Sequence, residues 1–447
     1  MVDELRPYPK YKESLLTWLG KVPEHWKEKR AKYYFYEVDE RSTTGTEQLM
    51  SVSHKTGVTP RKANVTMFMA ESNIGHKICR PGDLVINTMW AWMAAMGVVR
   101  KAGIVSPSYG VYRPLPVLSY IPGYIDYLIR AQPYVSEYIC RSTGIRSSRL
   151  RLYPDDFLCI PFVCPPIQEQ KSIVKFITYI DELVRRFIRN RRRMIEIFAE
   201  RLEATTNDAL KIFGTQQLRL GVVADRVERP INNLDNEIYT PIGLFNWGRG
   251  IFHKPPTKST ELGDSSFFLI KEGDLVLSGQ FAWEGAVALA GQEDTGCVAS
   301  HRYPILRGKN GIVESAYLFS FFRTGMGHVL LDHHSRGAAG RNRPLNASNL
   351  MKEKIPIPPS HVQQGITDFV KSEATLRRYI ASEIALVKEY RTRLITDVVT
   401  GKLDVRHISP EIEVEQAELI NMDEDIHDEE FGYEEPDFDE EVTDDDD

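Results

Sequence analysis

The sequence GDLVI at residues 82–86 recurs as GDLVL at residues 273–277, and this recurrence decides how the rest of the chain is interpreted. An Ala-Trp dipeptide follows each copy, at residues 91–92 and 282–283, so the offset of 191 residues is kept. Similar segments at a fixed offset indicate a duplicated module, which has to be recognised before the fold is assigned. We therefore expect one module to occur twice in this 447-residue chain.

The second half of the module repeats at an offset of 193 residues and ends in a long helical pattern. The Pro-Pro pair at 165–166 corresponds to the pair at 358–359, and proline suits the first turn of a helix because the first N–H groups there lack partners. After each pair, apolar residues follow the three- to four-residue spacing of one helical face, as far as Gly214 and Gly401. Roughly 40 residues would give a helix about 60 Å long.

Neither apolar stripe can remain exposed, which limits the possible architectures. The two long helices can pack on each other as an antiparallel coiled coil, or each can be buried within its own domain. The first solution is the more economical and is our prediction. Short apolar runs that follow Gly-Asp turns predict strands in the rest of each module. The fold class is then α+β, with two mixed α/β domains joined by the two long helices.

Charge is distributed unevenly along the chain. The formal net charge is −6, but residues 409–447 contain 20 Asp or Glu and no Lys or Arg. The first 408 residues therefore carry 56 basic and 42 acidic side chains (62 − 20), a surplus of +14. A basic body suits a partner that is a polyanion, because neutralised phosphates release counterions. The acidic segment predicts a disordered tail that either solubilises the protein or competes with a nucleic acid.

Several other classes of protein are disfavoured. The N-terminus lacks the apolar core of a signal peptide and the longest apolar run, 89–99, is too short to span a bilayer, so we expect a cytoplasmic protein. The five cysteines are scattered and have no zinc-ligand spacing, which indicates reduced thiols. There is no GxxxxGK[ST] loop or glycine-rich turn for a dinucleotide or adenosyl cofactor. The sequence CPPI at 164–167 lacks the polar first and aromatic fourth residues of the Asn/Asp-Pro-Pro-aromatic loop of methyltransferases that act on amino groups.

One pattern resembles a metal-dependent nuclease motif, and the repeat provides a test of it. Asp155, Glu169 and Lys171 have the loose PD…ExK spacing, in which two carboxylates hold a metal ion beside the attacked phosphate. The corresponding residues of the second copy are Ser348, Val362 and Gln364, which could not do this chemistry. Glu169 also falls in the first turn of the predicted helix, where an acidic residue suits the helix dipole. We interpret the pattern as structural.

Residues suited to nucleic acid lie in corresponding loops of the two copies. The first copy has GIRSSRLR at 144–151 and the second has GAAGRNR at 337–343. Glycine permits close backbone approach, arginine can bind guanine or phosphate, and asparagine can pair with adenine. An exposed basic loop without a special role is the alternative. The predicted DNA-contacting residues are Lys55, Arg61, Lys62, Tyr109, Arg146, Ser147, Arg149, Arg151, Arg249, His253, Lys254, Lys258, Gln280, His301, Arg302, Arg336, Arg341, Asn342 and Arg343.

Two further features have both a structural and a functional interpretation. Trp92 and Trp283 stand at matching positions, which favours a place in the core over a contact to bases. The arginines between residues 185 and 193 favour a solvated helical face, with a contact to phosphate or to a partner as the alternative.

With this order of elements, the chain resembles the specificity subunits of type I restriction-modification systems. The resemblance covers about residues 11–405 and is most specific in three segments. YKES at 11–14, WLG at 18–20 and VPEHW at 22–26 resemble the family's N-terminal signature. PPIQEQ at 165–170 resembles the motif that opens the central helix, and YRTRLITDVVTGKLDV at 390–405 resembles the motif that closes the distal helix. Two features depart from the pattern: SHVQQ at 360–364 and the acidic tail.

The resemblance implies a division of labour between this chain and its partners. It implies target-recognition domains at 1–165 and 215–357 and the family's conserved spacer helices at 166–214 and 358–403, whereas composition, not the resemblance, predicts the acidic disordered tail at 404–447. Each domain would read one half of a bipartite, asymmetric DNA site, and the helices would set the gap and dock two methylation subunits. This chain would bind no cofactor or metal and have no catalytic residue. S-adenosylmethionine, ATP and Mg²⁺ would belong to the methylation and motor-nuclease subunits.

Because the loops at 144–151 and 337–343 differ, we expect two different half-sites. Two other classes of function stay open at this stage. A stand-alone nuclease or methyltransferase would turn over without partners. A structural or inhibitory protein whose acidic tail mimics DNA would lose its function when residues 409–447 are removed, whereas a DNA reader would bind DNA equally well or more tightly.

Overall fold

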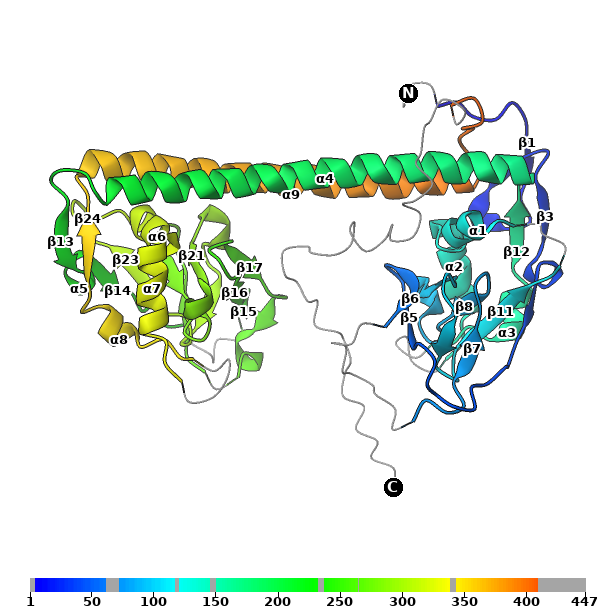
Figure 1. Ribbon diagram of the computed structural model, residues 1–447, viewed down its shortest axis with the longest axis horizontal. Helices are drawn as coiled ribbons and strands as arrows, with labels where there is room; N and C mark the ends of the chain where they lie inside the picture. Colours follow the sequence, from blue (N-terminus) through cyan, green and yellow to red (C-terminus); the bar gives the residue numbers. More distant parts are fainter. Residues whose placement is uncertain are drawn as a thin grey trace. The chain divides into compact units, whose positions relative to one another are not determined.

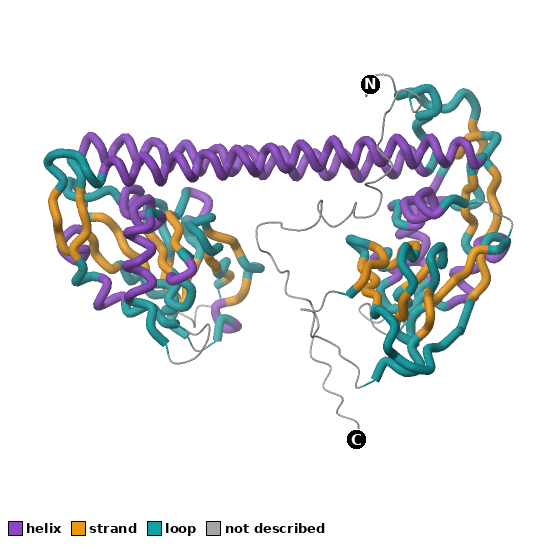
Figure 2. Tube along the Cα trace, viewed as in Figure 1, coloured by secondary structure: helices purple, strands orange, loops and turns teal. Residues whose placement is uncertain are grey.

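In the computed structural model, the described residues are 5–61, 72–116, 120–144, 150–231, 237–263, 265–337 and 343–408. They form two compact units. Unit 1 contains the described residues up to Arg189 together with 383–408, and unit 2 contains those from Asn190 to Ser382. The fold is mixed α/β with two long helices, as predicted: α4 (Ile167–Ala209) and α9 (Ser360–Val399) (Figure 1). Figure 2 shows each of these helices as uninterrupted.

The long helices begin where the sequence predicts and end slightly earlier. Each starts directly after a Pro-Pro pair. The predicted segment 166–214 is helical only to Ala209, because the chain turns before Gly214, whose φ of +91° favours glycine. The second helix ends at Val399, two residues before Gly401, whose φ is +80°. None of the helices in the described part of the chain is long and apolar enough to cross a membrane.

Unit 1 is built around a four-stranded antiparallel sheet with the order β4-β11-β8-β9. Helix α1 packs on β9, and α2 packs on the short helices η2 and η4. The strands are β1 (Tyr11–Glu13), β2 (Lys21–Pro23), β3 (Lys27–Arg30), β4 (Phe35–Glu37), β5 (Met50–Ser53), β6 (Gly57–Pro60), β7 (Lys77–Cys79), β8 (Leu84–Ile86), β9 (Met96–Val98), β10 (Gly103–Val105), β11 (Gly110–Pro114) and β12 (Pro161–Cys164). The helices are η2 (Thr17–Leu19), η3 (Ala31–Tyr33), η4 (Ala91–Met93), α1 (Pro122–Ile129), α2 (Gln132–Arg141) and α3 (Pro154–Leu158).

Unit 2 repeats this architecture with its own four-stranded antiparallel sheet, in the order β14-β23-β20-β21. Helix α6 packs on the last three of these strands. The strands are β13 (Gln216–Arg219), β14 (Ala224–Arg226), β15 (Ile238–Tyr239), β16 (Ile242–Leu244), β17 (Ile251–His253), β18 (Thr257–Lys258), β19 (Phe267–Leu269), β20 (Leu275–Leu277), β21 (Val287–Leu289), β22 (Val298–Ser300), β23 (Ile305–Gly308) and β24 (Lys354–Ile357). The helices are α5 (Leu220–Val223), η6 (Ser259–Glu261), η7 (Ala282–Glu284), η8 (Gln292–Asp294), α6 (Ser315–Arg323), α7 (Gly325–His333) and α8 (Ala347–Leu350).

In unit 1, the first part of α4 contacts the last part of α9 through an apolar interface with one buried ion pair. The apolar side chains include Ile177, Ile180, Leu394 and Ile395. Within this interface, Arg391 Nε of α9 donates to Asp181 Oδ1 of α4 at 2.6 Å, and Tyr127 of α1 donates to the other carboxylate oxygen at 2.9 Å. A buried charge is tolerated only when it is paired and hydrogen-bonded, so this pair requires both helices in place.

In unit 2, both long helices dock on α6 through polar contacts. Glu373 of α9 accepts two hydrogen bonds from Arg323 of α6, at 2.7 and 3.0 Å. Burial acts to raise the pKa of Glu373, but the hydrogen bond and charge of Arg323, with those of Arg377, hold it below its ordinary value. Thr206 of α4 bonds to Ser320 of α6 at 2.6 Å. The helix pair of unit 2 is therefore fixed by a different set of residues from that of unit 1.

The arginines between residues 185 and 193 are paired in part with acidic residues of their own helix. Arg185 lies 3.1 Å from Glu182, and Arg193 donates to Glu196 and Glu200 at 2.9 and 3.2 Å. Arg193 is exposed and fits a solvated helical face, whereas the Arg185 side chain is largely buried and does not.

The segment directly after α9 belongs to unit 1, which corrects the predicted start of the tail at residue 404. Val405 and Ile408 are fully buried in the unit 1 core. Asp404 pairs with Arg406, whose guanidinium lies 5.0 Å from the centre of the Tyr8 ring. The side chains of 404–408 are apolar or paired, but the acidic composition of the whole segment 404–447 led us to include them in the tail. The rest of the predicted tail, 409–447, lies outside the described residues.

Candidate nucleic-acid interface

A buried aspartate anchors the central strand of each unit in the same way. Asp83 precedes β8 and accepts from the backbone N–H of Arg80 at 2.9 Å and from Arg113 Nε at 3.0 Å. Asp274 precedes β20 and accepts from the backbone N–H of Lys271 at 2.9 Å and from Arg229 Nη1 at 2.6 Å. Both carboxylates are at most 2% exposed, so both depend on arginine partners, and Asp274 has a second one, Arg307, whose Nε lies 3.1 Å from its Oδ1.

The chain that leaves each of these strands is held by two equivalent hydrogen bonds. The backbone N–H of Leu152 donates to Thr88 O at 3.0 Å, and that of Leu345 donates to Gly279 O at 2.9 Å. One residue further on, the indole N–H groups of Trp92 and Trp283 donate to the carbonyls of Met89 and Gln280 at 3.0 and 3.2 Å. The two tryptophan side chains thus fix the backbone that follows each central strand.

A second segment reaches the same place from the neighbouring strand. Val111 of β11 pairs with Val85, and Ile305 of β23 pairs with Val276, so Ser108 and Arg302 are equivalent. In unit 1 the Thr88 hydroxyl donates to Ser108 O at 2.9 Å, and in unit 2 the backbone N–H of Gly279 donates to Arg302 O at 2.6 Å. We call Thr88, Met89 and Ser108 the rim of unit 1, and Gly279, Gln280 and Arg302 the rim of unit 2.

Gly279 allows the closer approach seen in unit 2. A Cβ atom at this position would lie 2.3 Å from Arg302 O, a distance that real Cβ atoms do not adopt. Unit 1 has a threonine here, and its hydroxyl bridges to the neighbouring carbonyl instead. The same framework therefore carries two differently spaced and differently charged rims.

The rim of unit 2 opens onto a groove with a volume of about 940 Å³. Most of its charged lining is basic, and the carboxylate among its described lining residues, that of Glu353, pairs with His334 at 3.0 Å. A basic groove of this kind suits a phosphate backbone. Residues of the lining that carry nitrogen donors are Arg226, Gln280, His301, Arg302, His333, His334, Arg336, Asn346, Asn349 and Lys352.

The structure brings four of the predicted contact residues together in this groove: Gln280, His301, Arg302 and Arg336. Arg343 lies close to it but is held by structural contacts. Its guanidinium donates to Asp332 at 2.7 Å and to Ser335 O at 3.1 Å, and lies 4.8 Å from the centre of the Trp283 ring.

The predicted contacts of the β16–β18 region, Arg249, His253, Lys254 and Lys258, are not part of the groove lining. His253 pairs with Asp294 at 2.7 Å. The guanidinium of Arg249 lies 5.5 Å from the centre of the Phe245 ring, and its Nε donates to Asn246 O. The side chains of Lys254 and Lys258 are exposed.

In unit 1, Tyr109 and Arg151 lie near the rim. Asn87 donates to the Tyr109 hydroxyl at 3.1 Å. Burial raises the pKa of Tyr109, an effect that the charge of Arg61 partly offsets. The guanidinium of Arg151 lies 4.0 Å from the Met89 sulfur. Lys55 stands on the β5–β6 turn, and its carbonyl accepts from Arg130.

Six predicted contacts lie outside the described residues: Lys62, Arg146, Ser147, Arg149, Arg341 and Asn342. The two loops that contain the last five have matching bases. Thr143 bridges to Arg151 in unit 1, and Ser335 bridges to Leu345 in unit 2. Ser142 and Ser335, at equivalent positions of the two units, are both buried.

Comparison with known proteins identifies the fold. No protein-family model matches the sequence, and no curated protein matches it. Among solved structures, a chain from a study of complex assembly and conformational transition of the type I restriction-modification system is 17% identical, with a TM-score of 0.51 over 85% of this chain and 99% of that one. The chain shares its fold with this type I system protein.

Two further structures are similar at lower scores. The HsdS subunit from Thermoanaerobacter tengcongensis is 17% identical, with a TM-score of 0.42 over 85% of this chain and 98% of its own. The S subunit of the type I system from M. genitalium is 11% identical, with a TM-score of 0.37 over 84% of this chain and 96% of its own.

Of the rim residues, the sequence analysis had singled out Gln280 and Arg302 of unit 2, and it had not singled out much of the lining of the groove. Arg226, His333, His334, Asn349 and Lys352 line it and were not predicted. The 193-residue offset aligns 345–352 with 152–159, the segment that contains α3 of unit 1. Asn349 and Lys352 therefore lie in a repeated segment, and the repeat could have drawn attention to them. His333 and His334 end helix α7, which the sequence analysis did not resolve.

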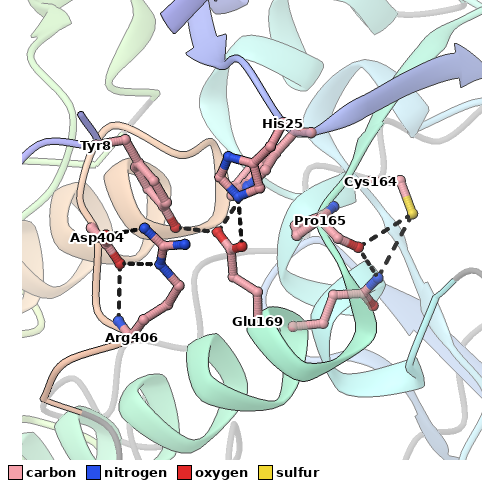
Figure 3. Close-up of polar contacts among 9 residues, drawn as sticks. Tyr8, His25, Cys164, Pro165, Glu169, Asp404 and Arg406 are labelled. Carbon is pink, nitrogen blue, oxygen red and sulfur yellow. Dashed lines mark hydrogen bonds and ion pairs between the residues drawn. The ribbon is translucent and has the colours of Figure 1, made fainter. Parts of the chain in front are cut away.

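Glu169, one of the three residues of the nuclease-like pattern, has a structural role at the start of α4 (Figure 3). Its carboxylate accepts from the Tyr8 hydroxyl at 2.5 Å and from Trp26 Nε1 at 2.8 Å, and it bonds to His25 Nε2 at 2.8 Å. Burial and the hydrogen bond to Glu169 raise the pKa of Tyr8 well above its ordinary value. No cluster of three metal-ligating side chains occurs among the residues that the structure describes.

Proposed function

We propose that this chain is the DNA sequence-specificity subunit of a type I restriction-modification complex and reads a bipartite, asymmetric site. The observation that carries the proposal is the presence of one framework in two units with chemically different rims, one of which opens onto a basic groove. The fold shared with a type I system protein supports it. Each unit would recognise one half-site, and the difference between the rims would make the half-sites different.

In this proposal, α4 and α9 form an antiparallel coiled-coil spacer between target-recognition domains at 1–165 and 215–357. Contacts within each unit support antiparallel packing. In unit 1, Asp181 of α4 meets Arg391 of α9. Val174 of α4 lies beside Gly123, and the next residue, Tyr124, donates to Val399 O at the end of α9. In unit 2, Phe198 packs on Phe369, and Gly214 lies against Pro359. The spacer would fix the number of unspecified base pairs between half-sites.

The long helices also expose apolar side chains that suit docking of two methylation subunits. In unit 1 these are Leu183, Leu386 and Tyr390, and in unit 2 they are Met194, Ile197 and Tyr379. Exposed aliphatic and aromatic side chains are typical anchors of protein interfaces. The partners would supply methylation with S-adenosylmethionine, and motor-nuclease subunits would supply ATP- and Mg²⁺-dependent cleavage. We expect the complex to act on DNA in the cytoplasm.

Selection of DNA from a random duplex library tests this function. The full-length chain, assembled with its methylation subunits, should enrich duplexes that contain two different half-sites at a constant separation. Enrichment of a palindrome, or of no sequence, would contradict the proposal. The purified chain alone, with Mg²⁺ and S-adenosylmethionine, should give neither cleaved nor methylated DNA, and turnover by the chain alone would favour the enzyme alternative.

Shortening the spacer tests its role as a ruler. Removal of seven residues after Arg193 should change the number of unspecified base pairs or abolish binding, because two helical turns are lost from one helix. The bases of the half-sites should stay the same. A changed half-site sequence would contradict the assignment of recognition to the two units.

A further inference from the structure

Met89 and Gln280 occupy the same position in the two units. Each stands three residues after the last residue of the central strand, β8 or β20. The backbone carbonyl of each accepts the indole N–H of the tryptophan three residues further on, at 3.0 and 3.2 Å. The preceding carbonyl is held by Leu152 or Leu345, at 3.0 and 2.9 Å. The backbone of this position is thus fixed on both sides in both units.

The side chains at this position are half-buried in both units but differ in chemistry. Gln280 lines the basic groove together with His301 and Arg302. Its side-chain amide makes no hydrogen bond to any residue that the structure describes. Met89 has no hydrogen-bond donor, and its sulfur lies 4.0 Å from the guanidinium of Arg151. Both positions therefore pair a candidate base contact with a nearby cation that suits phosphate.

The chemistry of the two side chains predicts which base edges they would recognise. A glutamine amide can donate to N7 and accept from N6 of adenine in the major groove, and this bidentate pair discriminates against other bases. A methionine can offer only an apolar contact, for which the 5-methyl group of thymine is the matching feature of a base edge. Gln280 needs no rearrangement to do this, since its amide has no described partner to leave.

We propose that residues 89 and 280 are the equivalent specificity-determining positions of the two units, Gln280 binding an adenine edge and Met89 contacting a thymine methyl group. This proposal rests on the proposed function, which requires each unit to read a half-site. It assigns the asymmetry of the site in part to a single pair of side chains on a shared framework.

Exchange of the two residues tests the proposal in the full-length chain assembled with its methylation subunits. The probe is a random duplex library, and the readout is the base preference at every position of the enriched sequence. For Gln280→Met, preference for adenine at one position of one half-site should fall about tenfold, a typical effect of losing one bidentate contact. For Met89→Gln, preference for adenine should rise at one position of the other half-site.

Two further variants separate recognition from folding. Gln280→Glu has nearly the same shape and should shift the preferred base at the same position from adenine to cytosine, because a carboxylate accepts from cytosine N4. Gln292→Met makes the same change as Gln280→Met at an exposed position outside the groove and should leave the enriched sequence unchanged.

The outcomes distinguish the two proposals. If the unmodified chain enriches two half-sites but Gln280→Glu and Met89→Gln leave every base preference unchanged, the assignment of these positions is wrong and the proposed function stands. Changes in both half-sites from one substitution would also overturn the assignment. If the unmodified chain enriches no bipartite sequence, the proposed function itself fails.

Discussion

Unit 1 presents Thr88, Met89 and Ser108 at the end of its central sheet, where unit 2 presents Gly279, Gln280 and Arg302. The groups that position these residues are the same in both units: a buried aspartate before the strand and a half-buried tryptophan after it. The rims themselves differ in local structure as well as in charge, since Gly279 permits the close approach to Arg302 O where the Thr88 hydroxyl bridges to Ser108 O. A duplicated domain can change what it binds without loss of stability when recognition and framework use separate residues.

A second contrast lies at the start of the long helices. Glu169 accepts hydrogen bonds from Tyr8 and Trp26 in unit 1, whereas the equivalent residue of unit 2 is Val362, which is partly buried. The next residue is a glutamine in both units and makes equivalent hydrogen bonds. Gln170 and Gln363 each donate to the carbonyl of the first proline, at 2.9 and 2.8 Å, and each accepts one backbone N–H at 2.9 Å. The contrast suggests the following tests, from the largest expected effect to the smallest.

Glu169→Ala should be the most damaging of these changes. The substitution leaves the buried Trp26 N–H and Tyr8 hydroxyl without a partner, so we expect the free energy of unfolding of unit 1 to fall by about 3 kcal/mol. Val362→Ala, the matched change in unit 2, should cost about 1 kcal/mol. Denaturant unfolding followed by hydrogen exchange in each unit measures both. Equal costs would mean that the Glu169 contacts do not stabilise unit 1.

Gln170→Ala and Gln363→Ala should have similar effects, since each removes the bonds to the first proline carbonyl and to one backbone N–H. The further bond of Gln363 to Ile312 O has a weaker counterpart in the contact of Gln170 with Cys164 Sγ. We expect each substitution to lower the free energy of unfolding of its own unit by about 2 kcal/mol. The same unfolding experiment compares them. A difference of more than about 1 kcal/mol would show that the two helix starts are not equivalent in energy.

Arg302→Ser and Ser108→Arg exchange the charge of the rims and should have the smallest effect. If Arg302 binds a phosphate, its loss should weaken DNA binding about fivefold and reduce the slope of log affinity against log salt concentration by about one. Ser108→Arg should change both quantities in the opposite direction. Binding measured over a series of salt concentrations checks this. An unchanged slope for Arg302→Ser would remove Arg302 from the phosphate contacts.

The sequence predicted the long helices and the repeat because both depend on periodic patterns that local chemistry imposes. The Pro-Pro pairs start the helices, and the Gly-Asp turns mark the central strands. His333 and His334 of the groove could not be predicted in this way, because they line it only when helix α7 is folded against α6 and η7. The contacts of Arg343 with Asp332 and Trp283 could not be predicted from composition either, because they also depend on the folded arrangement of distant residues.

Residues 404–408 show a similar limit of sequence patterns. The acidic composition of the whole C-terminal segment outweighed the signal from Val405 and Ile408, which are buried in unit 1. Their burial depends on a surface made by distant parts of the chain, including the Tyr8 segment. A local sequence pattern cannot predict a contact between segments that are distant in the sequence.

Mapping of methylated adenines in the host genome tests the central claim most directly. Single-molecule sequencing of DNA from cells with and without this chain would detect the site that the complex modifies. We predict a methylated motif, present only with the chain, that has two different half-sites separated by a fixed number of unspecified bases. A palindromic motif, a single contiguous motif or a methylation pattern that is the same in both cells would contradict the account of one framework that reads two different sequences.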